Sequence, residues 1–469
     1  MKRWAAVAAA TISAAVLWHF GTGLRPLAGL AMLAPIPVLV LAPRVSAGSA
    51  FLAGTVSRLI GAGQLWPYFV GTLEQPVPVT VLLLGGTAVA FGGAVVLVRS
   101  LLIRGRMVSA LMVLPAGWVG FEYLLAVFGP FGAWWSIAYT QVEVLPLIQT
   151  AALAGPWAIT FLILLAPTTI GVLAAPAVTR EQRLRIGGGV AALFVAVAAF
   201  GFWRLAVPQD RTATRVGLIA VAQPADYVPV SSPEGLDMVR RAVVEIEQLA
   251  DRGAEVVVLP EKAWRADESM LPLLSGPLSE VAARRGIHVV AGMVLTRDGD
   301  SVNAAIEYPS GVEYAKHYPV PGLEDELRPG TEWRQVPGEP WALAVCFDLD
   351  RPGLVRANVA RGAELLLVPA LDFTDDAWLH SRMAVLRGVE SGVGVARAPQ
   401  LGELVASDDR GRVLAAARTD VTVTRAVIAA IPGSAGRTIY ARFGDWFAWI
   451  SVALFAVSTA RCLPGGRNS

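Results

Sequence analysis

The chain has 469 residues, of which 55% are hydrophobic and only 16% are charged. This balance excludes an ordinary soluble enzyme and is typical of a membrane protein. The formal net charge of +2 gives no indication of nucleic-acid binding. The two cysteines and four histidines show no metal-ligand spacing, so we expect neither a metal nor another cofactor.

A succession of apolar runs occupies the first 206 residues, and one more lies near the C-terminus. Each is near or above the roughly 20 residues needed to cross a bilayer. The runs cover residues 4–22, 27–43, 48–72, 77–103, 107–128, 146–175, 186–206 and 443–460. We therefore predict a multi-span α-helical membrane protein with eight transmembrane helices. A cleaved signal peptide is the alternative for the first run, but a second apolar run follows it at once.

The positions of the basic residues predict the orientation. With a cytoplasmic N-terminus, each inner segment between apolar runs carries arginine, whereas the short outer loops hold Arg25 and little else, and the outer stretch 129–145 has no Lys or Arg. Both termini are then cytoplasmic. We predict a transmembrane domain of seven helices at 1–211, an extracytoplasmic domain at 212–436, and a final helix with a cytoplasmic tail at 437–469.

The pattern of residues 212–436 predicts a layered α/β domain. Five short, almost wholly apolar runs are typical of strands buried on both faces. They are "VGLIAVAQP", "AEVVVLPEK", "HVVAGMVL", "WALAVCFD" and "AELLLVPA". Residues 232–255 and 377–392 have apolar residues at helical spacing between such runs. Helices that alternate with buried strands indicate an α/β architecture.

Three reactive side chains follow predicted strands of this domain. Glu261 follows "VVVLP", Lys316 follows "GVEYA" and Cys346 follows "WALAV". In open α/β sheets, functional residues tend to lie just beyond the carboxyl ends of strands. Taken singly, each has an ordinary structural explanation. Glu261 is then a loop acid, Lys316 a surface charge and Cys346 a small buried side chain. Taken together, they provide a base, a cation for an oxyanion and a nucleophile.

The motifs around these residues resemble a known signature. "LPEKAW", "YAKHYPVPGLE" and "VCFD" are similar to the Glu–Lys–Cys motifs of the nitrilase (carbon–nitrogen hydrolase) superfamily. The segments 117–125, 132–163 and 436–446 resemble its membrane-embedded branch, the apolipoprotein N-acyltransferase family. The resemblance covers nearly the whole chain. It implies eight membrane spans, with a nitrilase-like α-β-β-α sandwich domain inserted before the last one.

The resemblance also implies catalytic roles. Cys346 becomes the nucleophile, Glu261 the general base and Lys316 the cation that stabilises the oxyanion. Glu324, eight residues after Lys316, matches a further glutamate that supports the triad. The backbone N–H near Phe347 becomes the second oxyanion donor.

Several positions depart from the family pattern. Phe347 and Asp348 stand where Tyr and Glu are usual, so Asp348 supports the thiol with a shorter carboxylate. "VPALDFTDD" at 368–376 replaces an Asn-Asp-x-Trp-Phe stretch, and Glu403 replaces a Ser or Thr. These positions shape the substrate pocket, so they leave the acceptor open.

Five further residues are candidates for contact with lipid or substrate. Glu122 and Gln141 match family positions, and polar satisfaction inside the membrane explains them equally well. Arg58 lies within the third apolar run and indicates a polar path or a headgroup contact, unless it snorkels to the surface. Trp264 and Trp333 are expected in mobile outer loops that touch lipid, the alternative being packing within the domain.

The resemblance implies an acyltransferase of the bacterial inner membrane. The thiol takes an acyl chain from a phospholipid as a thioester and passes it to the α-amine of a diacylglyceryl-modified apolipoprotein, with ping-pong kinetics. We expect a monomer that needs no cofactor and binds no nucleic acid. The alternatives are a membrane-anchored carbon–nitrogen hydrolase or amidase with a different acceptor, and a catalytically degenerate homologue that binds lipoproteins.

Overall fold

The structure is a computed structural model, and it describes residues 2–209, 211–224 and 227–462. The chain divides into two compact units. The first, a helical unit, comprises residues 1–128, 135–203 and 445–469. The second, an α/β unit, comprises residues 129–134 and 204–444.

Apolar helices build the helical unit. Their bounds are α1 (Lys2–Gly21), α2 (Leu30–Leu33), α3 (Ile36–Leu41), α4 (Ala47–Ala62), α5 (Val77–Ile103), α6 (Met107–Phe128), α7 (Leu145–Ile148), α8 (Ala151–Ala154), α9 (Pro156–Leu173), α10 (Arg180–Ala206) and α16 (Trp446–Ala460). Among the described residues, five helices are long and apolar enough to cross a membrane, namely α1, α5, α6, α9 and α10. Three shorter apolar helical segments cover 30–44, 145–154 and 446–460.

The predicted count of eight spans is not reproduced by helix length alone. The run at 48–72 forms the 16-residue α4, followed by a 3₁₀ turn and a π-helical turn at Tyr68–Thr72. The run at 146–175 is interrupted at Gly155, whose φ of +68° ends α8 before Pro156 begins α9. A glycine with a positive φ followed by a proline stops the first helix and starts the second, and this shortens the apolar helix that follows.

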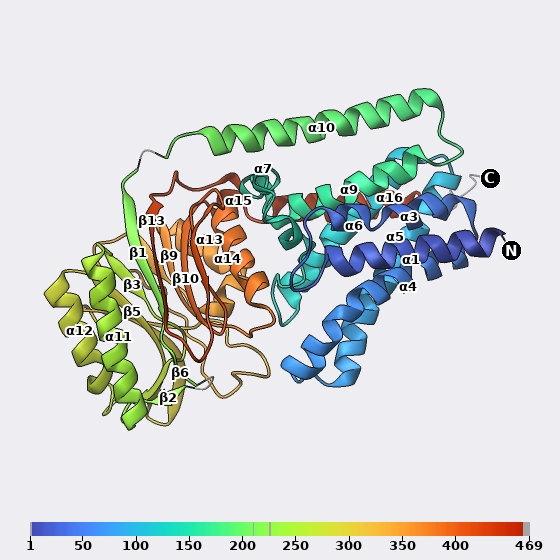
Figure 1. The fold of residues 1–469 in the computed structure, drawn as a ribbon. Coiled ribbons are helices and arrows are strands. Elements are labelled where there is room, and N and C mark those ends of the chain that lie inside the picture. The colour runs from blue at the N-terminus through green and yellow to red at the C-terminus, as the bar shows by residue number, and fades with distance from the viewer. Residues whose placement is uncertain (1, 210, 225–226, 463–469) are drawn as a thin grey trace. The chain divides into compact units, whose positions relative to one another are not determined.

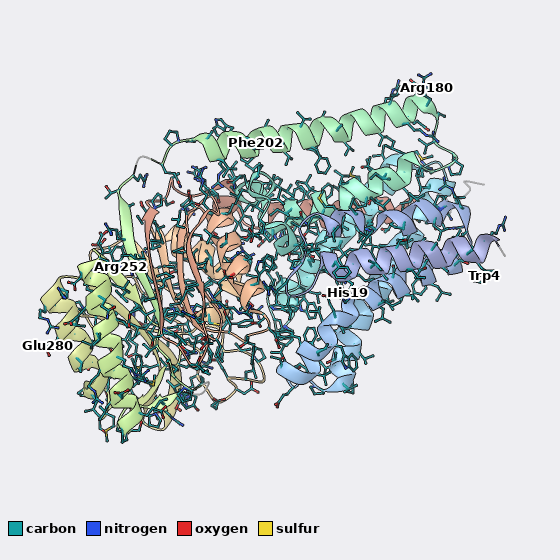
Figure 2. All side chains as sticks on the ribbon, in the orientation of Figure 1. Trp4, His19, Arg180, Phe202, Arg252 and Glu280 are labelled. Carbon is teal, nitrogen blue, oxygen red and sulfur yellow. The ribbon has the colours of Figure 1, made fainter. Side chains whose placement is uncertain are left out.

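Small residues allow the helices of this unit to approach closely. A Cβ on Gly61 of α4 would lie 2.3 Å from Cβ of Trp18 on α1, and one on Gly92 of α5 would lie 2.1 Å from Oγ1 of Thr55 on α4. Within a bilayer the hydrophobic effect does not drive helices together, and close van der Waals packing at small residues takes its place. By contrast, only 6% of the apolar part of α10 is buried, and α10 runs apart from its neighbours between Arg180 and Phe202 (Figure 2).

Two sheets form the middle of the α/β unit. In the first, the strand order is β13-β1-β3-β5-β4-β2, with β6 beside β5 and β7 beside β6. In the second, the order is β12-β11-β10-β9-β8. The bounds are β1 (Ala213–Ala220), β2 (Val228–Pro229), β3 (Val256–Val258), β4 (Trp264–Asp267), β5 (His288–Arg297), β6 (Asp300–Tyr308), β7 (Glu313–Ala315), β8 (Trp341–Leu343), β9 (Leu365–Leu371), β10 (Gly394–Gln400), β11 (Glu403–Ser407), β12 (Val413–Arg418) and β13 (Arg425–Pro432).

Helices cover the outer faces of both sheets. The first sheet packs against α11 (Pro233–Asp251) and α12 (Pro272–Arg285), and the second against α13 (Pro352–Ala360) and α14 (Ala377–Ser391). Between the sheets lies a third core that includes Val258, Leu343 and Leu367. Figure 1 shows the resulting order of helix, sheet, sheet and helix. The short α15 (Ile439–Phe443) follows β13. The predicted α/β domain is thereby confirmed, and each of the five predicted strand runs contains a strand.

Strand direction places the expected reactive residues. β3 and β5 are parallel, and β7 runs with them because β6 is antiparallel to both β5 and β7. The carboxyl ends of β3 and β7 therefore lie at one edge of the first sheet, and Glu261 and Lys316 follow those ends. Cys346 follows β8, which is parallel to β9 in the second sheet.

Candidate active site

Lys316 lies between two buried carboxylates. Its Nζ is 2.7 Å from Oε1 of Glu261 and 2.7 Å from Oε2 of Glu324. All three side chains are only 1% exposed. Buried charges of this kind are stable only when they are paired and hydrogen-bonded. The structure thus brings together three of the residues that the sequence singled out.

Two residues that the sequence analysis missed complete this cluster. Nδ2 of Asn303, on β6, donates hydrogen bonds to Oε1 of Glu261 at 2.5 Å and to Oε1 of Glu324 at 2.8 Å. Nζ of Lys262 lies 2.8 Å from the same Oε1 of Glu324. Lys262 has a φ of +50°, a backbone conformation that a lysine adopts only at an energetic cost. A lone asparagine in the apolar strand "VNAAIEY" was the available signal for Asn303.

The ion pairs set the charges of the cluster. Burial alone would lower the pKa of Lys316, but Glu261 and Glu324 outweigh burial and raise this pKa above its usual value. Burial would raise the pKa of Glu324, but Lys316 and Lys262 together lower it to about 2. Lys316 is therefore a cation and Glu324 an anion at neutral pH.

Cys346 sits at the sharp junction between β8 and a 3₁₀ turn. Its φ is +42°, one of the few positive values outside glycine in the described residues. Its Sγ donates to the carbonyl oxygen of Leu371 at 3.4 Å and accepts from Nη2 of Arg397 at 3.8 Å. Burial and the charge of Glu261 raise the pKa of the thiol well above its usual value, while Lys316 and Arg397 oppose this. The resting thiol is consequently neutral and needs a base to become a nucleophile.

Asp348 fixes the turn that carries the thiol. Its carboxylate accepts hydrogen bonds from the hydroxyl of Tyr314 at 2.7 Å and from three backbone N–H groups, those of Val345, His317 and Tyr318, at 3.0, 3.1 and 3.0 Å. Burial raises the pKa of Asp348 to about 6, against the pull of Lys316 and these donors. The shorter carboxylate, a departure from the family pattern, therefore has a complete set of partners.

Phe347 lies in the same turn, directly after the thiol. Its side chain is buried, and the guanidinium carbon of Arg351 lies 5.7 Å from the centre of its ring. This contact is a weak cation–π interaction at the edge of the useful range. The ring thus helps to hold the turn.

A second buried charge cluster lies behind the thiol. Arg397, on β10, makes a two-pronged contact with Asp372, whose Oδ2 is 2.6 Å from Nη1. Nδ1 of His380 lies 3.4 Å from Asp372 and 3.3 Å from Asp376. Burial opposes charge on His380, but the two carboxylates outweigh it and raise the pKa of His380 well above its usual value. Asp372, which the sequence analysis placed in an atypical stretch, thereby orients the arginine next to the thiol.

The two tryptophans expected in outer loops differ in position. Trp264 is fully buried on β4, and its Nε1 donates to the carbonyl oxygen of Gly235 at 3.3 Å. The expectation that Trp264 lies in a mobile outer loop is therefore wrong, and the alternative, packing within the domain, holds for this residue. Trp333 does lie in a loop, partly buried, with its ring 4.9 Å from that of His317 and 4.2 Å from the guanidinium of Arg361.

Arg58, Glu122 and Gln141 belong to the helical unit, not to the cluster around Cys346. Gln141 is buried, and its Nε2 donates to Oγ1 of Thr140 at 3.0 Å. Both oxygens of Glu122 accept hydrogen bonds. The donors are the Nε1 of Trp118, the Oγ of Ser136, the backbone N–H of Ile137 and the Oγ1 of Thr160. Glu122 thus joins α6, α9 and the segment between them.

A Glu–Lys–Cys set on a four-layer α/β sandwich, in a chain that also has a bundle of apolar helices, fits the membrane-embedded branch of the nitrilase superfamily that the motifs resemble. Comparison with known proteins narrows this class. Residues 13–168 match the family model of the apolipoprotein N-acyltransferase N-terminal domain.

Curated relatives carry the same family name. The apolipoprotein N-acyltransferase of Geobacter metallireducens is 29% identical over 490 aligned positions, which cover 93% of this chain and 91% of the relative. That of Gloeobacter violaceus is 29% identical and covers 79% of this chain and 76% of the relative. These matches confirm the resemblance of the chain to the apolipoprotein N-acyltransferase family. Among solved structures, an amidase of the nitrilase superfamily from Nesterenkonia matches with 20% identity and a TM-score of 0.40, covering 48% of this chain and 93% of that one.

Proposed function

We propose that the chain transfers an acyl chain from a membrane phospholipid to the α-amine of the diacylglyceryl-modified N-terminal cysteine of apolipoproteins. The observation that supports this most is the buried Lys316 between Glu261 and Glu324. Cys346, whose backbone has a positive φ, lies in the same unit. The relatives named apolipoprotein N-acyltransferase support the choice of substrates.

In the first half-reaction Glu261 takes the proton from Sγ of Cys346, and the thiolate attacks the carbonyl carbon of a phospholipid ester. The charged Lys316 stabilises the tetrahedral oxyanion, with the backbone N–H near Phe347 as a second donor. The ester C–O bond then breaks, and Glu261 returns the proton to the departing alkoxide. A lysophospholipid leaves, and the acyl chain remains as a thioester on Cys346.

In the second half-reaction the α-amine of the apolipoprotein attacks the thioester carbonyl. Glu261 accepts a proton from the amine, the tetrahedral intermediate expels the thiolate, and the proton returns to Sγ. The products are an N-acylated lipoprotein and the starting enzyme. Glu324 takes no proton in this scheme, because Lys316 and Lys262 keep it ionised; its role is to hold Lys316 in place.

The proposal includes a topology. Eight spans anchor a monomer in the bacterial inner membrane, both termini face the cytoplasm, and residues 212–436 work as the catalytic domain on the outer face, between the seven helices of 1–211 and the last helix in 437–469. The apolar helices and the arginine distribution support this arrangement. Both substrates are anchored in lipid, so an enzyme embedded in the same membrane meets them by lateral diffusion.

A rescue experiment tests the proposal. A bacterial strain depleted of its own N-acyltransferase receives the full chain or its Cys346→Ala variant, and the N-terminal peptide of one lipoprotein is analysed by mass spectrometry. We expect an amide-linked third acyl chain with the full chain and none with the variant. Lipoproteins that stay diacylated while free fatty acid accumulates would instead show a hydrolase, and N-acylation by the variant would show that the thiol is not the nucleophile.

A further inference from the structure

Unpaired hydrogen-bond donors gather where α1 meets α4. The guanidinium carbon of Arg58 lies 4.9 Å from the ring centre of Trp18. Arg58 is 8% exposed and Trp18 is 1% exposed. Nε and Nη1 of Arg58 and Nε1 of Trp18 are buried, and no acceptor among the described residues pairs with them. Buried side-chain donors are normally satisfied, and an uncompensated cation inside a membrane protein is expensive.

The protein's own carboxylate does not fill this place. Glu122 is the acidic side chain whose charge acts on Arg58. Both of its oxygens already accept hydrogen bonds from other donors, and within the described part of the chain it forms no ion pair with Arg58 at 4.0 Å or less. Glu122 therefore does not supply the acceptor that the buried donors of Arg58 lack.

The donors are held rigidly. Gly61 lets α4 approach Trp18 so closely that a Cβ there would lie 2.3 Å from Cβ of Trp18. The indole ring meets the ring of Phe91 edge to face, with the ring centres 5.4 Å apart. Trp18 in turn covers one face of the guanidinium. These neighbours restrict the movement of Arg58, so its buried, unpaired Nε and Nη1 are preorganised for an incoming acceptor.

The depth of the pair matches a lipid headgroup. Trp18 lies three residues before the end of α1 at Gly21, and Arg58 lies four residues before the end of α4 at Ala62. At about 1.5 Å per residue, Trp18 is roughly 5 Å inside the end of α1. The contact with Trp18 places Arg58 at the same depth, although the run that contains Arg58 continues to residue 72. In the topology proposed above, on which this step rests, the end of α1 faces outward. The pair then lies close to the layer of glycerol and phosphate groups in the outer leaflet.

We propose that Arg58 and Trp18 form a binding site for the phosphate diester of a glycerophospholipid in the outer leaflet. A planar guanidinium forms paired hydrogen bonds with phosphate oxygens, and an indole N–H adds one further donor. The phosphate is common to all glycerophospholipids, whereas the diacylglyceryl group of the acceptor has none. The site therefore distinguishes the acyl donor from the acyl acceptor by charge.

The site can be tested without acyl transfer. The full chain with Cys346→Ala is purified in a neutral detergent, and native mass spectrometry follows the binding of dioctanoyl phosphatidylglycerol, dioctanoylglycerol or inorganic phosphate. Arg58→Gln, Arg58→Lys and Trp18→Phe are compared in this background. Arg185→Gln is the matched control, because Arg185 is a highly exposed arginine of the same unit, paired with Glu181.

We expect phosphatidylglycerol to bind about tenfold more weakly to Arg58→Gln and about threefold more weakly to Trp18→Phe, since tenfold corresponds to the loss of about one charge-assisted hydrogen bond. Arg58→Lys keeps the positive charge but loses the paired N–H groups of the guanidinium, so its affinity for phosphatidylglycerol should lie between those of the parent and Arg58→Gln. Arg185→Gln should bind this lipid as the parent does. Dioctanoylglycerol should bind weakly to every variant. Equal binding of phosphatidylglycerol by Arg58→Gln and the parent would overturn the proposal, as would equal binding of the two lipids. Stronger binding of inorganic phosphate than of the lipid would make this a site for free phosphate and would also overturn it.

Folding and function are separated in this design. The thermal unfolding temperature of each variant in lipid-free detergent is measured first, and Arg58→Gln should not lower it, because the substitution removes an unpaired buried charge. If Arg58→Gln does not fold, Arg58→Lys and Trp18→Phe decide the question by the same binding measurement. The parent in these measurements is the Cys346→Ala chain, which cannot transfer an acyl group through this thiol. Lipid binding that depends on Arg58 would therefore support this proposal even if the rescue experiment detects no N-acylation. Conversely, a successful rescue would not save this proposal if Arg58→Gln bound the lipid as the parent does.

Discussion

Removal of the charge on Lys262 should weaken catalysis although this residue does not touch the thiol. Its Nζ lies 2.8 Å from Oε1 of Glu324, and the two side chains are 15% and 1% exposed. Lys262→Met keeps the length of the side chain and removes the cation. Glu324 would keep three donors, which are Nζ of Lys316, Nδ2 of Asn303 and the backbone N–H of Val320. The expected effect is therefore that of one lost contact rather than of a broken cluster.

The magnitude follows from that count. A hydrogen bond to a charged group contributes about 1.5–3 kcal/mol. If this loss loosens Lys316 at the point where the oxyanion forms, kcat falls about tenfold to hundredfold, at about 1.4 kcal/mol for each factor of ten. Lys262→Arg keeps the charge and should restore most of the rate. Arg240→Met, which removes an exposed ion pair with Asp237 on α11, is the matched control and should leave the rate unchanged.

The pH dependence gives a second, independent result. The pKa of Glu324 is depressed to about 2 by Lys316 and Lys262, against burial. A carboxylate with a depressed pKa contributes its stabilisation above its unfolded pKa, near 4.3, and loses it as the pH falls toward the folded value. Without Lys262 the pKa of Glu324 rises, so the acid limb of the pH–rate profile should move to higher pH. The assay is acyl transfer from a fluorescent phospholipid to a diacylglyceryl peptide, measured from about pH 2 to 9 so that the range includes the pKa of Glu324. An unchanged acid limb and an unchanged kcat in Lys262→Met would refute the reasoning.

Three other substitutions have defined outcomes. Asp348→Asn places an amide N–H against donors such as the backbone N–H of Val345, so one buried donor is left unpaired. The free energy of unfolding, measured by thermal unfolding, should fall by about 1–3 kcal/mol. Gly292→Ala would put a Cβ 2.6 Å from Cα of Glu261, so kcat should fall more than tenfold while circular dichroism still shows a folded protein. Arg397→Gln removes the cation 3.8 Å from the thiol, so alkylation of Cys346 by iodoacetamide should need a higher pH, and Arg397→Lys should partly restore it. An alkylation profile unchanged from the parent would argue against a role of Arg397 in thiol ionisation.

The candidate catalytic residues could be located from the sequence because each follows a strand. An apolar run followed by a polar residue marks the carboxyl end of a buried strand, and parallel ends meet at one edge. Glu261, Lys316 and Cys346 were therefore found without knowledge of any contact. Asn303 was not, because its approach to Glu261 depends on the pairing of β5 with β6, which the one-dimensional pattern does not contain.

Other features depend on local backbone conformation that the pattern of apolar residues does not reveal. Lys262 turns toward Glu324 from a residue with φ of +50°, and a consecutive Glu-Lys pair gives no sign of that turn. Trp264 was misplaced because a four-residue strand with alternating burial resembles a loop between longer runs. Apolar content likewise predicted one long span at 146–175, where Gly155 and Pro156 divide the segment.

The thioester on Cys346 tests the central claim most directly. The full chain is incubated with phospholipid and no acceptor, and its mass is then measured intact and after proteolysis. We expect one added acyl chain on the peptide that contains Cys346, its release by neutral hydroxylamine, and its transfer when a diacylglyceryl peptide is added. An acyl adduct that persists in Cys346→Ala, or transfer by the full chain without any adduct on Cys346, would contradict the account.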